Sequence, residues 1–127
     1  MFQTHGLSHI QLTVRDVERS ARFYKGLLGM EEIRRFDDCV MLRTPGSHEV
    51  FTINARAEAS TSAGEMGGIA HFGFRLREPL EMTTVLEEAA RLGGKPGDHG
   101  GRREKGRLYA YVTDPDGYEV ELFWEEN

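Results

Sequence analysis

Two segments of the chain carry apolar residues at the spacing of a helix. The first has Val17, Ala21, Tyr24 and Leu28 on one face, and the second has Met82, Val85, Leu86 and Ala89. Asp16 is placed to cap the first helix and Gly29 to end it. Pro79 suits the first turn of the second helix, which Gly93 and Gly94 stop. The pattern therefore predicts one helix in each half of the chain.

Short stretches of β-forming residues, separated by turn residues, indicate strands around these helices. A first strand with Ile10, Leu12 and Val14 on one face precedes the first helix, and a similar one with Phe72, Phe74 and Leu76 precedes the second. Further strands are predicted at Glu31–Phe36, Cys39–Arg43, Glu49–Ile53, Leu108–Thr113 and Tyr118–Trp124. This order predicts an α+β fold of two βαβββ modules.

A short repeat supports the division into two modules. Gly6-Leu7-Ser8-His9-Ile10 returns as Gly68-Ile69-Ala70-His71-Phe72, with glycine, apolar, small, histidine and apolar residues in the same order. We therefore predict a single domain whose first module spans residues 1–54 and whose second spans 68–127. A polar linker, residues 55–67, joins them; it reads as a slack joint or as a mobile flap.

Composition narrows the class of protein. The chain has 127 residues, a formal net charge of -5 and a pI near 5.5, which disfavours nucleic acid and anionic membranes as partners. No apolar run approaches the ~20 residues that a membrane helix needs. Cys39 is the single cysteine, and the first residues show no basic and apolar leader pattern. We expect a cytoplasmic protein with a small-molecule partner.

Alternation along the strands places polar residues of special interest on one face of the sheet. His9 and His71 lie opposite the apolar faces of equivalent strands, and both Glu119 and Glu121 do so on the last strand. Any one of these residues alone would be read as a solvated side chain. Two imidazoles and one carboxylate on separate strands match the facial triad that holds a divalent metal with positions left open for ligands. Either glutamate would satisfy this pattern.

These motifs resemble the vicinal oxygen chelate superfamily, which includes glyoxalase I, fosfomycin-resistance and bleomycin-binding proteins and the extradiol dioxygenases. The resemblance rests on four segments and two single residues. They are Leu7-Ser8-His9-Ile10, Thr13-Val14-Arg15-Asp16-Val17 with Ser20, Phe23-Tyr24 to Leu28-Gly29-Met30, His71, and Asp114-Pro115-Asp116-Gly117-Tyr118-Glu119-Val120-Glu121-Leu122. It implies a cupped mixed sheet with metal ligands at His9, His71 and Glu121. It also implies pairing of modules within one chain or by exchange between chains, and hence a homodimer.

The members of the superfamily differ in the residues that they carry around the metal, and this chain can be compared with each of them. Glyoxalase I has a further glutamate where this chain has Val50, with Glu49 on the opposite face of that strand. The extradiol dioxygenases fit better: they imply catalytic roles for His48 and Tyr111, and a substrate-binding role for His99. The plainer interpretations are a surface histidine for His48, a packed aromatic for Tyr111 and a loop residue for His99. The loop 95–107 carries several basic residues that could steer an anionic substrate.

We therefore expect a metal-dependent enzyme, with an extradiol-type Fe(II) dioxygenase acting on a catecholic or similar vicinal-oxygen molecule as the first hypothesis. The second hypothesis is a lyase or isomerase like glyoxalase I or an epimerase, which would use Ni, Co, Zn or Mn and needs His48 or Glu49 as its base. The third is a small-molecule binding or resistance protein, whose ligand affinity would not depend on the metal ligands.

Overall fold

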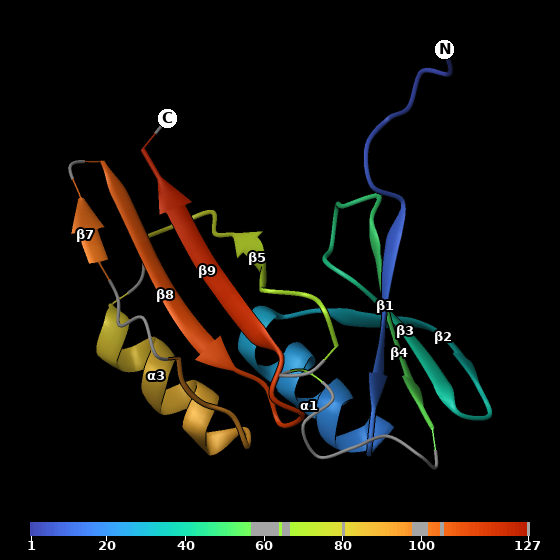
Figure 1. Ribbon diagram of the computed structural model, residues 1–127. Helices are drawn as coiled ribbons and strands as arrows, with labels where there is room; N and C mark the ends of the chain where they lie inside the picture. The colour runs from blue at the N-terminus through green and yellow to red at the C-terminus, as the bar shows by residue number, and fades with distance from the viewer. Residues whose placement is uncertain (57–63, 65–66, 80, 98–101, 105, 127) are drawn as a thin grey trace. The chain divides into compact units, whose positions relative to one another are not determined.

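The computed structural model describes residues 1–56, 64, 67–79, 81–97, 102–104 and 106–126. The chain divides into two compact units, Met1–Ala59 and Ser60–Asn127, and each is considered by itself (Figure 1). Each unit holds a mixed β-sheet and a helix, so the predicted α+β class is confirmed. None of the helices in the described ranges is long and apolar enough to cross a membrane. The module boundaries drawn from the sequence stay a prediction.

The first unit has the βαβββ order expected from the sequence. Its elements are β1 (His9–Val14), α1 (Val17–Leu28), β2 (Glu31–Phe36), β3 (Cys39–Arg43) and β4 (Val50–Ala55). The strands are arranged β1-β4-β3-β2, with β1 parallel to β4 and the other pairs antiparallel. Because β1 and β4 are parallel neighbours, helix α1 and strands β2 and β3 form the connection between them.

Helix α1 covers the apolar face of this sheet. Asp16 accepts a hydrogen bond from the backbone N–H of Arg19, and Gly29 ends the helix in a left-handed conformation, so both predicted caps are confirmed. The helix packs on β3 and β4, where the ring of Tyr24 lies 4.5 Å from that of Phe51 between centroids. The buried side chains of the unit are apolar almost throughout: Leu12, Val14, Ala21, Phe23, Tyr24, Met30, Val40, Leu42, Phe51 and Ile53.

The second unit has a similar order with additional short strands. Its elements are β5 (Phe72–Arg75), α3 (Met82–Arg91), β6 (Lys95–Pro96), β7 (Arg102–Glu104), β8 (Arg107–Thr113) and β9 (Glu119–Glu125). The strands are arranged β5-β9-β8-β6, with β7 paired to β8 and β5 parallel to β9. Helix α3 packs against β8 and β6. The core consists of Val85, Ala89, Leu92, Ala110, Val112, Tyr118, Val120 and Leu122.

Two expectations for this unit are wrong in detail. The segment 95–107, predicted as a loop, contains strands β6 and β7. These strands are too short to show alternation, and β6 leads to a close approach in which the Gly97 N–H donates to the Tyr111 carbonyl at 2.7 Å. A Cβ atom on Gly97 would lie 2.6 Å from the Cβ of Tyr111. Helix α3 begins at Met82 after Glu81, so Pro79 precedes the helix instead of forming its first turn.

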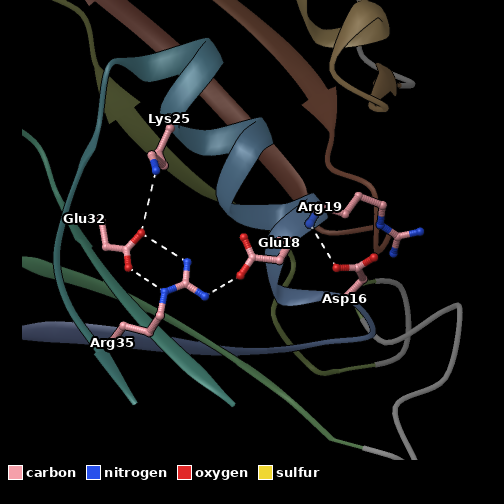
Figure 2. Close-up of polar contacts among 6 residues, drawn as sticks. All are labelled: Asp16, Glu18, Arg19, Lys25, Glu32 and Arg35. Atoms are coloured by element: carbon pink, nitrogen blue, oxygen red, sulfur yellow. Dashed lines mark hydrogen bonds and ion pairs between the residues drawn. The ribbon is translucent and has the colours of Figure 1, made fainter. Parts of the chain in front are cut away.

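An ion-pair network ties β2 to helix α1 at the surface (Figure 2). The guanidinium of Arg35 contacts both oxygens of Glu32, at 2.7 and 3.2 Å, and also pairs with Glu18. Lys25 lies 3.7 Å from the Glu32 carboxylate. The hydrogen bonds from Arg35 hold the pKa of Glu32 below its ordinary value. The network thus links the edge strand to the first and last turns of the helix.

Replacing Arg35 with methionine should lower the stability of the protein modestly, and only while Glu32 is ionised. A carboxyl group whose folded-state pKa is depressed stabilises the fold above its unfolded pKa, and this contribution disappears as the pH falls through the lowered value. The difference in urea midpoint between wild type and Arg35→Met should therefore be present at pH 7 and shrink below the ordinary glutamate value of 4.5. In a Glu32→Gln background this pH dependence should be largely lost; an equal difference at acid pH would contradict the prediction.

Candidate metal centre

The polar faces expected from the alternation are present in both sheets. Along β1, Leu12 and Val14 are buried while His9 and Gln11 are exposed. Along β9, Val120 and Leu122 are buried while Glu119 and Glu121 keep partial exposure. The register pairs of β5, β8 and β9 bring Gly73, Tyr111 and Glu121 side by side on this second polar face. The candidate chemistry of the second unit is therefore concentrated around Glu121.

The side chains of His71 and Glu121 form a close polar pair on this face. The Nε2 atom of His71 lies 3.5 Å from Oε2 of Glu121, and the two side chains are 44% and 23% exposed. Two atoms that each bind a metal at about 2.1 Å lie roughly 3.0–3.5 Å apart when the angle between them is near octahedral or tetrahedral. The donor set and its spacing thus fit a shared divalent cation that remains open to solvent on one side.

Gly73 provides the room that brings Glu121 beside the β5 strand. It is the register partner of Glu121, and a Cβ atom at Gly73 would lie 2.9 Å from the Glu121 carbonyl oxygen and 3.1 Å from its Cβ. Any larger residue would have to displace the β9 backbone at this point. The glycine two residues after His71 is therefore part of how this site is built.

Tyr111 completes the cluster from the neighbouring strand. It is the register partner of Glu121 on β8, and its ring packs edge-to-face on that of His71 with 5.3 Å between centroids. Burial, followed by the nearby carboxylates of Glu121 and Glu119, raises the pKa of the Tyr111 hydroxyl. Tyr111 thus keeps its proton at neutral pH and can donate a hydrogen bond.

His9 occupies the corresponding place in the first unit. Its Nδ1 atom lies 2.7 Å from the hydroxyl of Ser8, a contact that orients the ring and engages this nitrogen. Its register partner is Val50 on β4, whose N–H donates to the Ser8 carbonyl at 2.9 Å. His9 is therefore held at the exposed edge of its sheet.

Two further residues considered from the sequence, His48 and Glu49, lie in the segment just before β4. His48 is exposed and stands two residues before the partner of His9. The carboxylate of Glu49 accepts a hydrogen bond from the Ser47 hydroxyl, and this bond is the main cause of a lowered Glu49 pKa. A weaker base is less suited to abstracting a proton from carbon. His99 lies outside the described residues.

Within the residues that the structure describes, no three His, Cys, Asp or Glu side chains gather into one metal-holding group. The structure brings together His71, Glu121 and Tyr111 in the second unit, whereas His9 and His48 belong to the first. The complete set of His9, His71 and Glu121 stays a prediction. The sequence analysis assigned no role to Glu119 once the resemblance favoured Glu121. Glu119 is two residues from Glu121 on the same strand, so alternation already placed both on the polar face.

The chain belongs to the Glyoxalase/Bleomycin resistance protein/Dioxygenase superfamily, whose sequence model matches residues 6–122. The predicted family membership is thereby confirmed. Among solved structures, a glyoxalase/bleomycin resistance protein from Albidiferax ferrireducens T118 has a TM-score of 0.75 at 22% identity, with 94% of this chain and 98% of that chain covered. At this identity the likeness supports the fold alone.

Curated relatives with named activities are also similar to the chain. Metapyrocatechase from Geobacillus stearothermophilus is 30% identical over 98% of this chain, and a probable trivalent organoarsenical cleaving enzyme from Bacillus subtilis (strain 168) is 30% identical over 94%. The match covers 36% of the former protein and 80% of the latter, so the chain spans about a third of the length of the metapyrocatechase. Both relatives are named as enzymes.

Proposed function

We propose that the protein is a metal-dependent enzyme of the extradiol dioxygenase type, acting on a catecholic or similar small molecule with two vicinal oxygens. The observation that carries the proposal is the His71–Glu121 pair, 3.5 Å between Nε2 and Oε2, with Tyr111 packed against the imidazole. His9 is the third proposed ligand. A bound Fe(II) ion would supply Lewis-acid activation of the substrate oxygens and a place for dioxygen.

The proposed roles of the surrounding residues follow from their chemistry. Tyr111 keeps its hydroxyl proton and would donate a hydrogen bond to a substrate oxygen beside Glu121, which stabilises negative charge there. His48 is an exposed imidazole, and an imidazole is the side chain that most often serves as a general base, so His48 is suited to take a proton from the substrate hydroxyl. His99 remains a proposed substrate contact.

A lyase or isomerase of the same fold is the second candidate, and the first unit gives a reason to rank it lower. Such an enzyme needs a base next to the metal, and Glu49 is the nearest carboxylate to the position where glyoxalase I has one. The Glu49 carboxylate is instead engaged by Ser47 in a local turn that lowers its pKa. His48 would have to act as the base alone.

The experiment is anaerobic purification without chelator, elemental analysis and an oxygen-uptake screen with substituted catechols. Iron at about one ion per site, together with oxygen uptake that a His9→Ala, Glu121→Ala double variant lacks, is the expected result. Bound nickel, cobalt, zinc or manganese without oxygen uptake would favour the lyase or isomerase. A protein that binds none of these ions, and whose melting temperature none of them raises, would overturn both and leave a binding protein.

We further propose, from the family resemblance, that the protein works as a homodimer in the cytoplasm. Sedimentation at several protein concentrations would test the dimer independently of any activity.

A further inference from the structure

A pocket of about 500 Å³ lies within the second unit, beside the candidate metal ligands. Its lining includes Lys95, Thr113 and Glu119 from strands β6, β8 and β9, and Ile69, Ala70 and Pro115 from the segments around them. Ala70 directly precedes His71, and Glu119 stands two residues before Glu121. The volume suits a small molecule or the end of a larger one.

The polar lining residues form one row across the sheet. Lys95 is the register partner of Thr113, and Thr113 is the register partner of Glu119. Neighbouring strands lie about 4.8 Å apart, so the backbones of Lys95 and Glu119 are roughly 10 Å apart with Thr113 between them. An ammonium group and a carboxylate thus flank a hydroxyl on the same side of the sheet.

Glu119 carries an acceptor atom that lacks a donor. Its Oε1 atom is buried and has no hydrogen-bond partner in the described part of the chain. A buried carboxylate oxygen without a donor is costly, because it has lost its water and gained nothing in return. The neighbouring carboxylate of Glu121 faces His71, and no ion pair within 4.0 Å links Glu119 to Lys95 among the described residues. Glu119 lines the pocket and keeps partial exposure, so the accessible part of its carboxylate is available to a ligand donor.

We propose that this pocket binds a small molecule with a zwitterionic head group of the α-amino acid type. The ammonium group of the ligand donates to the accessible part of the Glu119 carboxylate, and the carboxylate of the ligand pairs with the Lys95 ammonium. Ile69, Ala70 and Pro115 contact its apolar body. The backbones of Lys95 and Glu119 are roughly 10 Å apart, so their side chains can hold between them the ammonium and the carboxylate that an α-amino acid carries on one carbon atom. This binding needs no metal, so it stands apart from the proposed oxygenase chemistry.

The test is calorimetric titration of the metal-free protein with three matched probes. L-Phenylalanine carries both charges, phenethylamine carries the ammonium alone, and 3-phenylpropionate carries the carboxylate alone. L-Phenylalanine should bind most tightly. Glu119→Gln should weaken L-phenylalanine and phenethylamine roughly 10-fold or more and leave 3-phenylpropionate unchanged, since a charge-assisted hydrogen bond is lost. Lys95→Met should weaken L-phenylalanine and 3-phenylpropionate instead.

Glu125→Gln is the matched control, because Glu125 lies on the same strand and already pairs with Arg75 at 3.2 Å. It should leave all three affinities unchanged. Glu119 has no ion pair within 4.0 Å among the described residues, so Glu119→Gln should leave the melting temperature close to that of wild type. No saturable binding of any probe, or binding of L-phenylalanine that Glu119→Gln leaves unaltered, would overturn the proposal. The Glu121→Ala variant separates this proposal from the proposed function. It should lose metal binding and keep probe binding, so either proposal can fail without the other.

Discussion

Glu121→Ala should bind a divalent metal at least about 100-fold more weakly than wild type, the largest effect that we expect from a single substitution. Losing even an outer-shell partner of a metal ligand costs 10- to 100-fold in affinity, and Glu121 is proposed as a ligand itself. The carboxylate lies 3.5 Å from His71 Nε2, so its removal leaves the imidazole without an anionic partner. The measurement is metal content after anaerobic purification, together with the rise in melting temperature that added metal produces.

Two comparison variants make this result interpretable. Glu125→Gln changes another carboxylate on the polar face of β9 and should keep the metal, since Glu125 pairs with Arg75 and Arg107. His9→Ala should lose metal to a similar extent if the first unit supplies the third ligand. Equal metal affinity in wild type and Glu121→Ala would contradict the proposed metal centre. If Glu121→Ala loses the metal and His9→Ala keeps it, His9 is not a ligand but Glu121 still is.

The elements and faces of this protein were largely predictable because they depend on local patterns. Alternation along β1 separated His9 from Leu12 and Val14, and the same rule separated Glu121 from Val120 and Leu122. Asp16 and Gly29 bound helix α1 as their capping chemistry predicts. The assignment of Glu121 over Glu119 came from the family resemblance, because parity treats both residues alike. The structure places Glu121 beside His71, and its role as a metal ligand stays a prediction.

What escaped prediction depends on contacts between distant segments. Strand β6 has two residues and exists because its backbone pairs with β8, which no pattern within Lys95–Pro96 signals. The row of Lys95, Thr113 and Glu119 likewise requires the register of three strands. Nothing in the sequence distinguishes Gly73 from any other glycine in a strand, whereas the structure shows that the close approach of β9 leaves no room for a side chain there. Local periodicity identifies faces, whereas register decides which side chains meet.

Asp114→Ala should destabilise the protein by about 2–4 kcal/mol, a large share of the roughly 5–15 kcal/mol that holds a domain folded. Asp114 is 3% exposed, and its Oδ1 accepts the backbone N–H groups of Asp116 at 2.9 Å and Tyr118 at 3.0 Å. These bonds shape the turn from which β9 starts. Alanine would leave two N–H groups in a buried turn without this acceptor, and urea unfolding measures the cost.

The matched substitutions separate the lost acceptor from the lost charge. Asp114→Asn keeps an oxygen at the same position and should cost clearly less than Asp114→Ala. Asp37→Ala alters an exposed aspartate in the turn between β2 and β3 and should stay within about 0.5 kcal/mol of wild type. Because Glu119 and Glu121 follow the Asp114 turn directly, Asp114→Ala should also weaken metal and probe binding, while Asp37→Ala should affect neither. If Asp114→Ala unfolds at the same urea concentration as wild type, the turn does not depend on this carboxylate and β9 is held by its register with β5 and β8 alone.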